Sequence, residues 1–114
     1  MNRLPIVWDP GYSPEFPESH RFPMAKFRLL KDWVDHHVPN TQIFTPTPCP
    51  IDVLVETHDP DYVHGFQSGT LDAKAIREIG LPWSEGLRDR TILALGGTMQ
   101  TCDLAKTYGL ASHL

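Results

Sequence analysis

The spacing of apolar residues in the first part of the chain predicts a strand, a helix and a second strand. Residues 4–8 (LPIVW) form a short apolar run that ends in an Asp-Pro-Gly turn, which is typical of a buried strand. From Pro23 onward apolar residues recur every three or four positions, and this helical pattern should end near His37, because a proline follows two positions later. Residues 41–46 (TQIFTP) are rich in β-forming residues and predict the second strand.

The remaining residues predict helices only. Short helices are expected at 51–57 and 71–79. Between them, Asp59 is placed to cap a third helix, with Pro60 at its first position and Gly69 at its end.

The longest predicted helix runs from Ser84 to a glycine stop at Gly109. Its interior contains Gly96 and Gly97, each of which costs roughly 1 kcal/mol relative to alanine in a helix. Such a pair is tolerated where another backbone comes close. One apolar seam is expected along this helix, made by Leu87, Thr91, Leu95, Thr98, Cys102 and Ala105.

This order of elements predicts an α/β fold, with a parallel sheet between helices on both faces. Two strands are too few for such a sheet, and the long seam has little in this chain to pack against. We therefore expect residues 1–114 to be an incomplete part of one larger domain.

Composition narrows the class of function. Hydrophobic residues make up 40% of the chain and the net charge is −4, so bulk charge favours neither nucleic acid nor a membrane as a partner. No secretory leader or membrane-spanning run is present in the sequence. Cys49 and Cys102 lack a disulfide-scaffold or zinc-ribbon spacing, which favours a reducing compartment, and we expect the cytoplasm.

Two histidine motifs raise the question of a metal site. The pair His36-His37 follows an aspartate, but at a helix C-terminus two histidines that complement the helix dipole are the favoured interpretation. His58 precedes Asp59, which is already needed as a helix cap. We therefore expect no metal ligand in either motif, although a metal phosphohydrolase that uses His58 and Asp59 is a weaker alternative.

Tyr12, His20 and Arg21 are candidates for a functional role. They lie in the loop that follows the first strand, and the loops at the carboxyl edge of a parallel sheet are where α/β folds place their sites. No helix-forming or apolar pattern accounts for His20 or Arg21.

Four stretches in the same order resemble the histone deacetylase superfamily, in particular its bacterial and class IV-like branch. The first, at 11–27, is GYSPEFPESHRFPMAKF. The others are ETHDPDYV (56–63), REIGLPWSEGLRDRT (77–91) and LALGGTMQTCDLAKTYGLASHL (93–114). The resemblance covers nearly the whole chain.

The resemblance implies a three-layer arginase/deacetylase fold and zinc-dependent hydrolysis of an acylated lysine, an acylated polyamine or a small amide. Tyr12 and Arg21 match positions near the foot of the acyl-lysine tunnel, where the guanidinium of Arg21 would bind the departing carboxylate through two hydrogen bonds. For His20 it implies no role beyond loop structure.

The chain departs from the family pattern in one respect. The family's paired catalytic histidines, its zinc ligands and its oxyanion-stabilising tyrosine would all lie beyond Leu114. We therefore expect no catalytic residue and no bound zinc within this chain, no activity of the chain alone, and a missing C-terminal part as its partner. The alternative from another class is a non-catalytic interaction module derived from the same fold, which would pair its open sheet edge with a partner.

Overall fold

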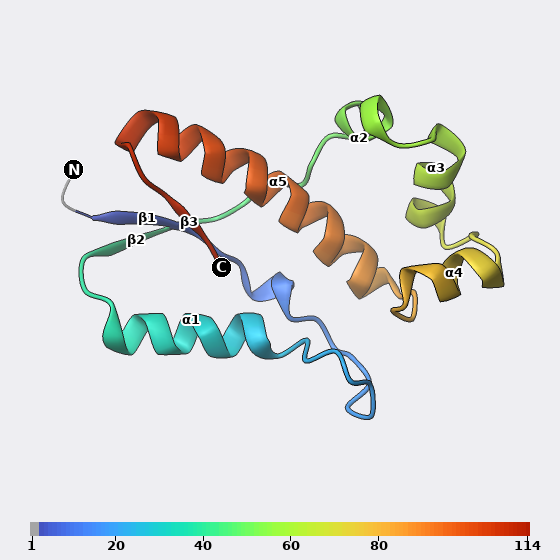
Figure 1. The fold of residues 1–114 in the computed structure, drawn as a ribbon, viewed down its shortest axis with the longest axis horizontal. Helices are drawn as coiled ribbons and strands as arrows, with labels where there is room; N and C mark the ends of the chain where they lie inside the picture. The colour runs from blue at the N-terminus through green and yellow to red at the C-terminus, as the bar shows by residue number, and fades with distance from the viewer. Residues whose placement is uncertain (1–2) are drawn as a thin grey trace.

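The computed structural model describes residues 3–114, which form a small parallel sheet with helices on both sides (Figure 1). Strand β1 (Leu4–Val7) lies between β2 (Thr41–Phe44) and β3 (Ser112–His113), and both neighbours run parallel to it. The first two strands confirm the sequence prediction. The third, only two residues long, was not predicted.

Two long helices lie on opposite sides of the sheet (Figure 1). Helix α1 (Lys26–His37) connects β1 to β2, and α5 (Glu85–Tyr108) returns the chain to β3. For the described residues, the predicted α/β class is thus confirmed, with a parallel sheet and helices on both of its sides.

The start of α1 was predicted wrongly. Pro23 lies three residues before the helix, and the N-cap residue Ala25 has no side-chain hydrogen bond. The hydroxyl of Ser13 substitutes for a local cap, because it accepts from the backbone N–H of Arg28 at 3.2 Å and donates to the Met24 carbonyl at 2.7 Å. A residue from a distant loop therefore determines where the helix begins.

Four short helices complete the chain, and their ends follow the sequence signals. The Asp59 carboxylate accepts from the backbone N–H of Asp61 at 2.8 Å, and Gly69 ends that helix at φ 73°, as predicted. Helices α2–α4 lie beside the N-terminal half of α5, away from the sheet (Figure 1). The elements are η1 (Pro10–Tyr12), α2 (Ile51–Thr57), α3 (Pro60–Ser68) and α4 (Ala73–Ile79).

The paired glycines of α5 allow the close approach that the sequence predicted. A Cβ atom at Gly96 would collide with the backbone carbonyl of Thr47 and would lie 2.8 Å from the backbone nitrogen of Cys49. A Cβ atom at Gly97 would collide with the hydroxyl of Tyr12 and lie 2.6 Å from Nε2 of His113. Helix α5 can therefore cross both segments at this point only without side chains.

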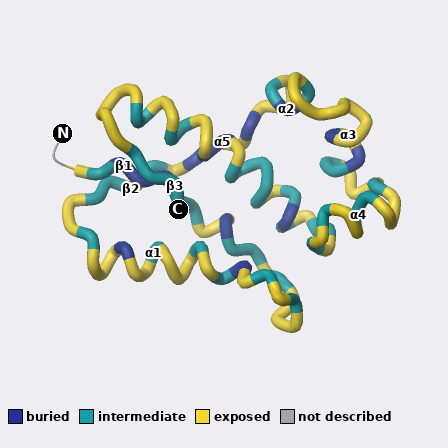
Figure 2. Tube along the Cα trace, viewed as in Figure 1, coloured by how far each residue is buried: buried dark blue, intermediate teal, exposed yellow. Residues whose placement is uncertain are grey.

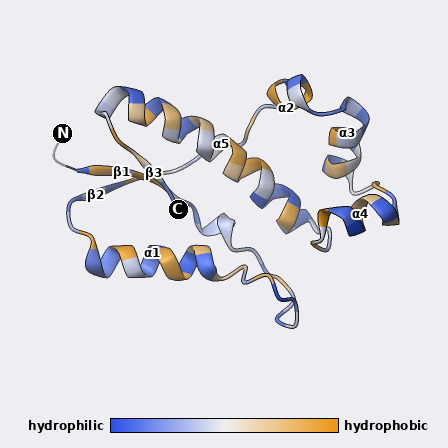
Figure 3. Cartoon of the chain, viewed as in Figure 1, coloured by the Kyte–Doolittle hydropathy of each residue, from blue (hydrophilic) through white to orange (hydrophobic). Residues whose placement is uncertain are grey.

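The core is small, and much of the expected seam of α5 is not covered. Ile6, Val7 and Tyr12 are almost fully buried where β1, η1 and α5 meet. Figure 2 shows exposed positions along most of α1 and at the C-terminal end of α5, two helices on which Figure 3 also shows apolar residues. Of the predicted seam, Leu87 is buried, whereas Leu95 is exposed. Thr98 and Cys102 are exposed as well.

No helix between residues 3 and 114 is both long and apolar enough to cross a membrane.

Candidate functional site

Tyr12 is the last residue of η1, in the loop that follows β1, and it is 1% exposed. The short helix η1 that carries it begins at Asp9, whose carboxylate accepts from the backbone N–H of Gly11 at 2.8 Å. The hydroxyl of Tyr12 lies 2.7 Å from Nε2 of His113, the last residue of β3. The loop after β1 is thus joined to the end of a second strand.

The hydrogen-bond partners of His113 determine which of its ring nitrogens carries the proton. The hydroxyl of Thr98 donates to the Ala94 carbonyl at 3.3 Å, so its oxygen is left to accept from Nδ1–H of His113 at 3.2 Å. Nε2 of His113 then carries the lone pair and accepts the hydroxyl proton of Tyr12. We call these three residues the Tyr12–His113–Thr98 network.

Burial favours a protonated Tyr12 and an uncharged His113, the forms that the Tyr12–His113–Thr98 network requires. It raises the pKa of Tyr12 to about 12, with a smaller contribution in the same direction from Asp9. Burial also lowers the pKa of His113, and the nearby Arg90 guanidinium adds to that shift. Neutral pH therefore leaves the tyrosine protonated and the histidine uncharged.

Arg90 fixes the backbone of the same loop. Its Nε–H donates to the Tyr12 carbonyl at 3.2 Å, and its guanidinium lies 4.4 Å from the centre of the Phe27 ring. Burial lowers the pKa of Arg90, and arginine side chains stay protonated in proteins. Nothing in the sequence pattern singled out Arg90, because its partners come from residues far away in the chain.

Arg21 lies in different surroundings from Tyr12. It is exposed, takes no part in the ion pairs of residues 3–114, and lines a wide hollow of about 540 Å³ within its own loop. Arg28 and His20 line the same hollow, whereas Tyr12 does not. The two site residues expected from the sequence therefore do not line a common pocket.

His20 has a structural role in that loop. Its Nδ1 accepts from the backbone N–H of Phe22 at 3.0 Å, and its ring packs edge to face on Phe16 with 5.1 Å between centroids. These two contacts stabilise the turn that carries Arg21.

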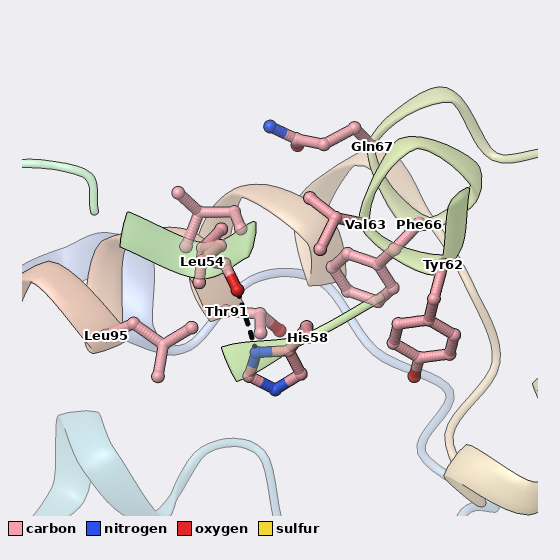
Figure 4. Close-up of a pocket in the computed structure, with 9 residues that line it drawn as sticks. Leu54, His58, Tyr62, Val63, Phe66, Gln67, Thr91 and Leu95 are labelled. Atoms are coloured by element: carbon pink, nitrogen blue, oxygen red, sulfur yellow. Dashed lines mark hydrogen bonds between the residues drawn. The ribbon is translucent and has the colours of Figure 1, made fainter. Parts of the chain in front are cut away.

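A second pocket, which the sequence did not predict, lies between α2, α3 and α5 (Figure 4). It encloses about 160 Å³ and is lined mainly by apolar side chains. Nδ1 of His58 lies 3.0 Å from the Thr57 hydroxyl and 3.2 Å from the Leu54 carbonyl. Tyr62 and Leu95 form part of the rim, and each is about two-fifths exposed.

The donors of residues 3–114 do not fit a zinc ion. No group of three His, Cys, Asp or Glu side chains within these residues is arranged to hold a metal. Nδ1 of His36 bonds the Asp32 carbonyl at 2.7 Å and Nδ1 of His37 bonds the Trp33 carbonyl at 2.8 Å, so both satisfy the end of α1. Asp59 caps α3, as described above.

Comparison with known proteins gives one informative match. No family model matches the chain. The chain is 46% identical over 112 residues to an uncharacterized protein of Picosynechococcus sp., a match that covers 96% of this chain and 37% of the relative. The chain thus spans little more than a third of the length of a protein that it otherwise resembles closely.

Proposed function

We propose that this chain is the N-terminal segment of a zinc-dependent deacetylase-like hydrolase with the arginase/deacetylase fold. The enzyme would remove an acyl group from an acylated lysine, an acylated polyamine or a related small amide. The observation that carries the proposal is the position of the 11–27 motif, which follows the carboxyl end of β1, the central strand of a parallel sheet. Sites of α/β enzymes lie at such an edge.

In this proposal Arg21 is the residue that binds the substrate or the product. Its guanidinium is exposed and lines the hollow of about 540 Å³, and a guanidinium can hold a carboxylate through two parallel hydrogen bonds. The residue therefore suits the carboxylate that amide hydrolysis releases.

Tyr12 takes a supporting role in the same site. Its hydroxyl proton is committed to His113, so the tyrosine offers no free donor to a substrate. It fixes the start of the 11–27 loop relative to β3 instead, and thereby supports from beneath the loop that carries Arg21.

Zinc would polarise the amide carbonyl of the substrate and activate the attacking water in such an enzyme. Because residues 3–114 lack a fitting donor set, the zinc ligands and the acid–base histidines would come from another part of the protein. No catalytic step is assigned to this chain.

The proposal is tested by a domain exchange. In the Picosynechococcus protein, the region that matches residues 1–114 is replaced by this chain, and acetate release is measured from acetyl-lysine peptides and acetylated polyamines. We expect activity that a zinc chelator abolishes. Arg21→Ala should reduce kcat/KM by at least tenfold, whereas Arg77→Ala, on exposed α4, should leave it unchanged. A folded exchange protein that hydrolyses none of these substrates would contradict the proposal.

A non-catalytic interaction module is the second candidate, favoured by the outer edges of β2 and β3, which pair with no strand of residues 3–114. It predicts an inactive exchange protein together with a folded, monomeric 114-residue chain.

A further inference from the structure

We propose that the hollow lined by Arg21 binds an α-amino acid as a zwitterion, so that the acyl group of the substrate itself carries an amino group. This inference deepens the proposed function and rests on it for the reaction. Binding of the amino acid can be tested without turnover.

Two carboxylates and two guanidiniums line this hollow. Glu15, Glu18 and Arg21 belong to the loop that follows η1, and Arg28 belongs to the first turn of α1. All four residues are exposed. Among the ion pairs of residues 3–114, none joins one of these carboxylates to one of these guanidiniums. Both signs of charge therefore line one space without pairing with each other.

The loop that carries these charges is held in shape by its own contacts. The Phe16 ring packs edge to face on His20, with 5.1 Å between centroids, and on Phe22, with 6.2 Å between centroids. The hydroxyl of Ser13 accepts from the backbone N–H of Arg28 at 3.2 Å, which ties the loop to α1. The backbone that carries the four charges is thus fixed before a ligand arrives, which lowers the entropy cost of binding.

The arrangement of charge disfavours a ligand of one sign. An anion such as phosphate is attracted by the two arginines and repelled by the two glutamates, and the reverse holds for a polyamine. A zwitterion pairs with both. The volume of about 540 Å³ suits a small molecule, and Phe16 and Phe22 also line the hollow, so they offer apolar surface to the side chain of an amino acid such as leucine.

Hydrolysis of an aminoacyl amide produces such a zwitterion. The C–N bond of the amide breaks, the water oxygen joins the carbonyl carbon to give a carboxylate, and both protons of the water go to the leaving nitrogen. Arg21 and Arg28 bind the new carboxylate. Glu15 and Glu18 bind the ammonium group that the acyl part carries throughout. The substrate class is therefore an amide whose acyl part is an α-amino acid, whereas an acetyl group meets only the arginines.

The test compares three ligands of nearly the same shape by isothermal titration calorimetry of the purified 114-residue chain. They are leucine, isocaproate, which lacks the amino group of leucine, and isopentylamine, which lacks its carboxylate. Leucine should bind at least threefold more tightly than either of the others, a modest factor because the charges are exposed. Leucine that binds no more tightly than isocaproate, or not at all, would overturn the inference.

Variants should separate the two signs of charge. Glu15→Gln with Glu18→Gln should remove the advantage of leucine over isocaproate, and Arg28→Gln should reduce its advantage over isopentylamine. Glu78→Gln, on exposed α4, is the matched control and should change neither. Variants that weaken all three ligands equally would show a purely structural effect and overturn the assignment of these residues.

The domain-exchange protein separates this inference from the proposed function, and the same titrations are repeated on it. It should hydrolyse Nε-leucyl-lysine peptides with a higher kcat/KM than Nε-acetyl-lysine peptides. Hydrolysis of the acetylated peptides without any preference for leucine or for the leucyl peptide would overturn the amino-acid site alone. Preferred binding of leucine without hydrolysis of any amide would overturn the proposed function alone.

Discussion

A single buried hydrogen bond, from the hydroxyl of Tyr12 to Nε2 of His113, joins residues 101 positions apart in the sequence. Tyr12→Phe removes the donor and leaves the histidine nitrogen buried without a partner, which should lower the free energy of unfolding by about 1–3 kcal/mol. Urea unfolding of both proteins measures the difference. Tyr108→Phe is the control, because Tyr108 is 44% exposed and its loss should change stability by less than about 0.5 kcal/mol.

Burial of the same tyrosine makes stability depend on alkaline pH. The pKa of Tyr12 is about 12 in the folded chain and 10.0 when unperturbed, so between these values the unfolded chain loses a proton that the folded chain keeps. The contribution is therefore complete below pH 10 and declines as the pH rises toward 12. Tyr12→Phe should flatten this decline in the unfolding free energy between pH 10 and 12, and an unaltered decline would show that other groups cause it.

Gly96 and Gly97 show how much one methyl group matters where α5 crosses the sheet. Gly97→Ala would press on the Tyr12 hydroxyl, and its overpacking cost of about 1–3 kcal/mol should outweigh the roughly 1 kcal/mol gained in helix propensity. Combined with Tyr12→Phe it should cost less than the sum of the two single changes, since the colliding oxygen is gone. Gly96→Ala meets the backbone carbonyl of Thr47, so Tyr12→Phe should give it no such relief.

At the scale of elements, the sequence predicted what local interactions determine. Asp59 and Gly69 bound α3 as expected, because a carboxylate cap and a left-handed glycine need only their nearest neighbours. The start of α1 was missed because Ser13 caps it from another segment. Strand β3 was missed because two residues carry no period and are defined only by pairing with β1.

The same distinction applies to the candidate site. Tyr12 and Arg21 are singled out by their position after a strand and by the resemblance of the 11–27 motif, and both are local signals. Their actual neighbours, His113 for one and the loop hollow for the other, depend on contacts across the fold that no spacing in the sequence reports.

Helix α3 offers a direct test of capping against metal binding. Asp59→Ala should lower the unfolding free energy by about 1 kcal/mol, because the backbone N–H groups of Asp61 and Tyr62 lose their acceptor. Asp59→Ser should restore most of that loss, since serine caps about as well. The measurement is urea unfolding with and without added divalent metal. Stoichiometric metal binding that both substitutions abolish would instead revive the phosphohydrolase alternative for His58 and Asp59.

At the scale of the whole molecule, the described residues form a flattened body of 48 × 35 × 17 Å with helices on both sides of a three-stranded sheet. The sheet is only three strands wide among the described residues, so it gives α1 and α5 little area to cover. The apolar positions that remain exposed on these two helices are thus a consequence of the fold.

The proposed function leads to a prediction about the isolated chain. Purified residues 1–114 should release no acetate from acetyl-lysine peptides at any zinc concentration, because residues 3–114 bring no three metal-binding side chains together and Arg21 alone can only bind a carboxylate. Acetate is measured by a coupled assay, with the domain-exchange protein as the positive control. Zinc-dependent turnover by the purified chain would refute the prediction and place the metal ligands within it. Binding of acetate that Arg21→Ala abolishes, without turnover, is the expected result.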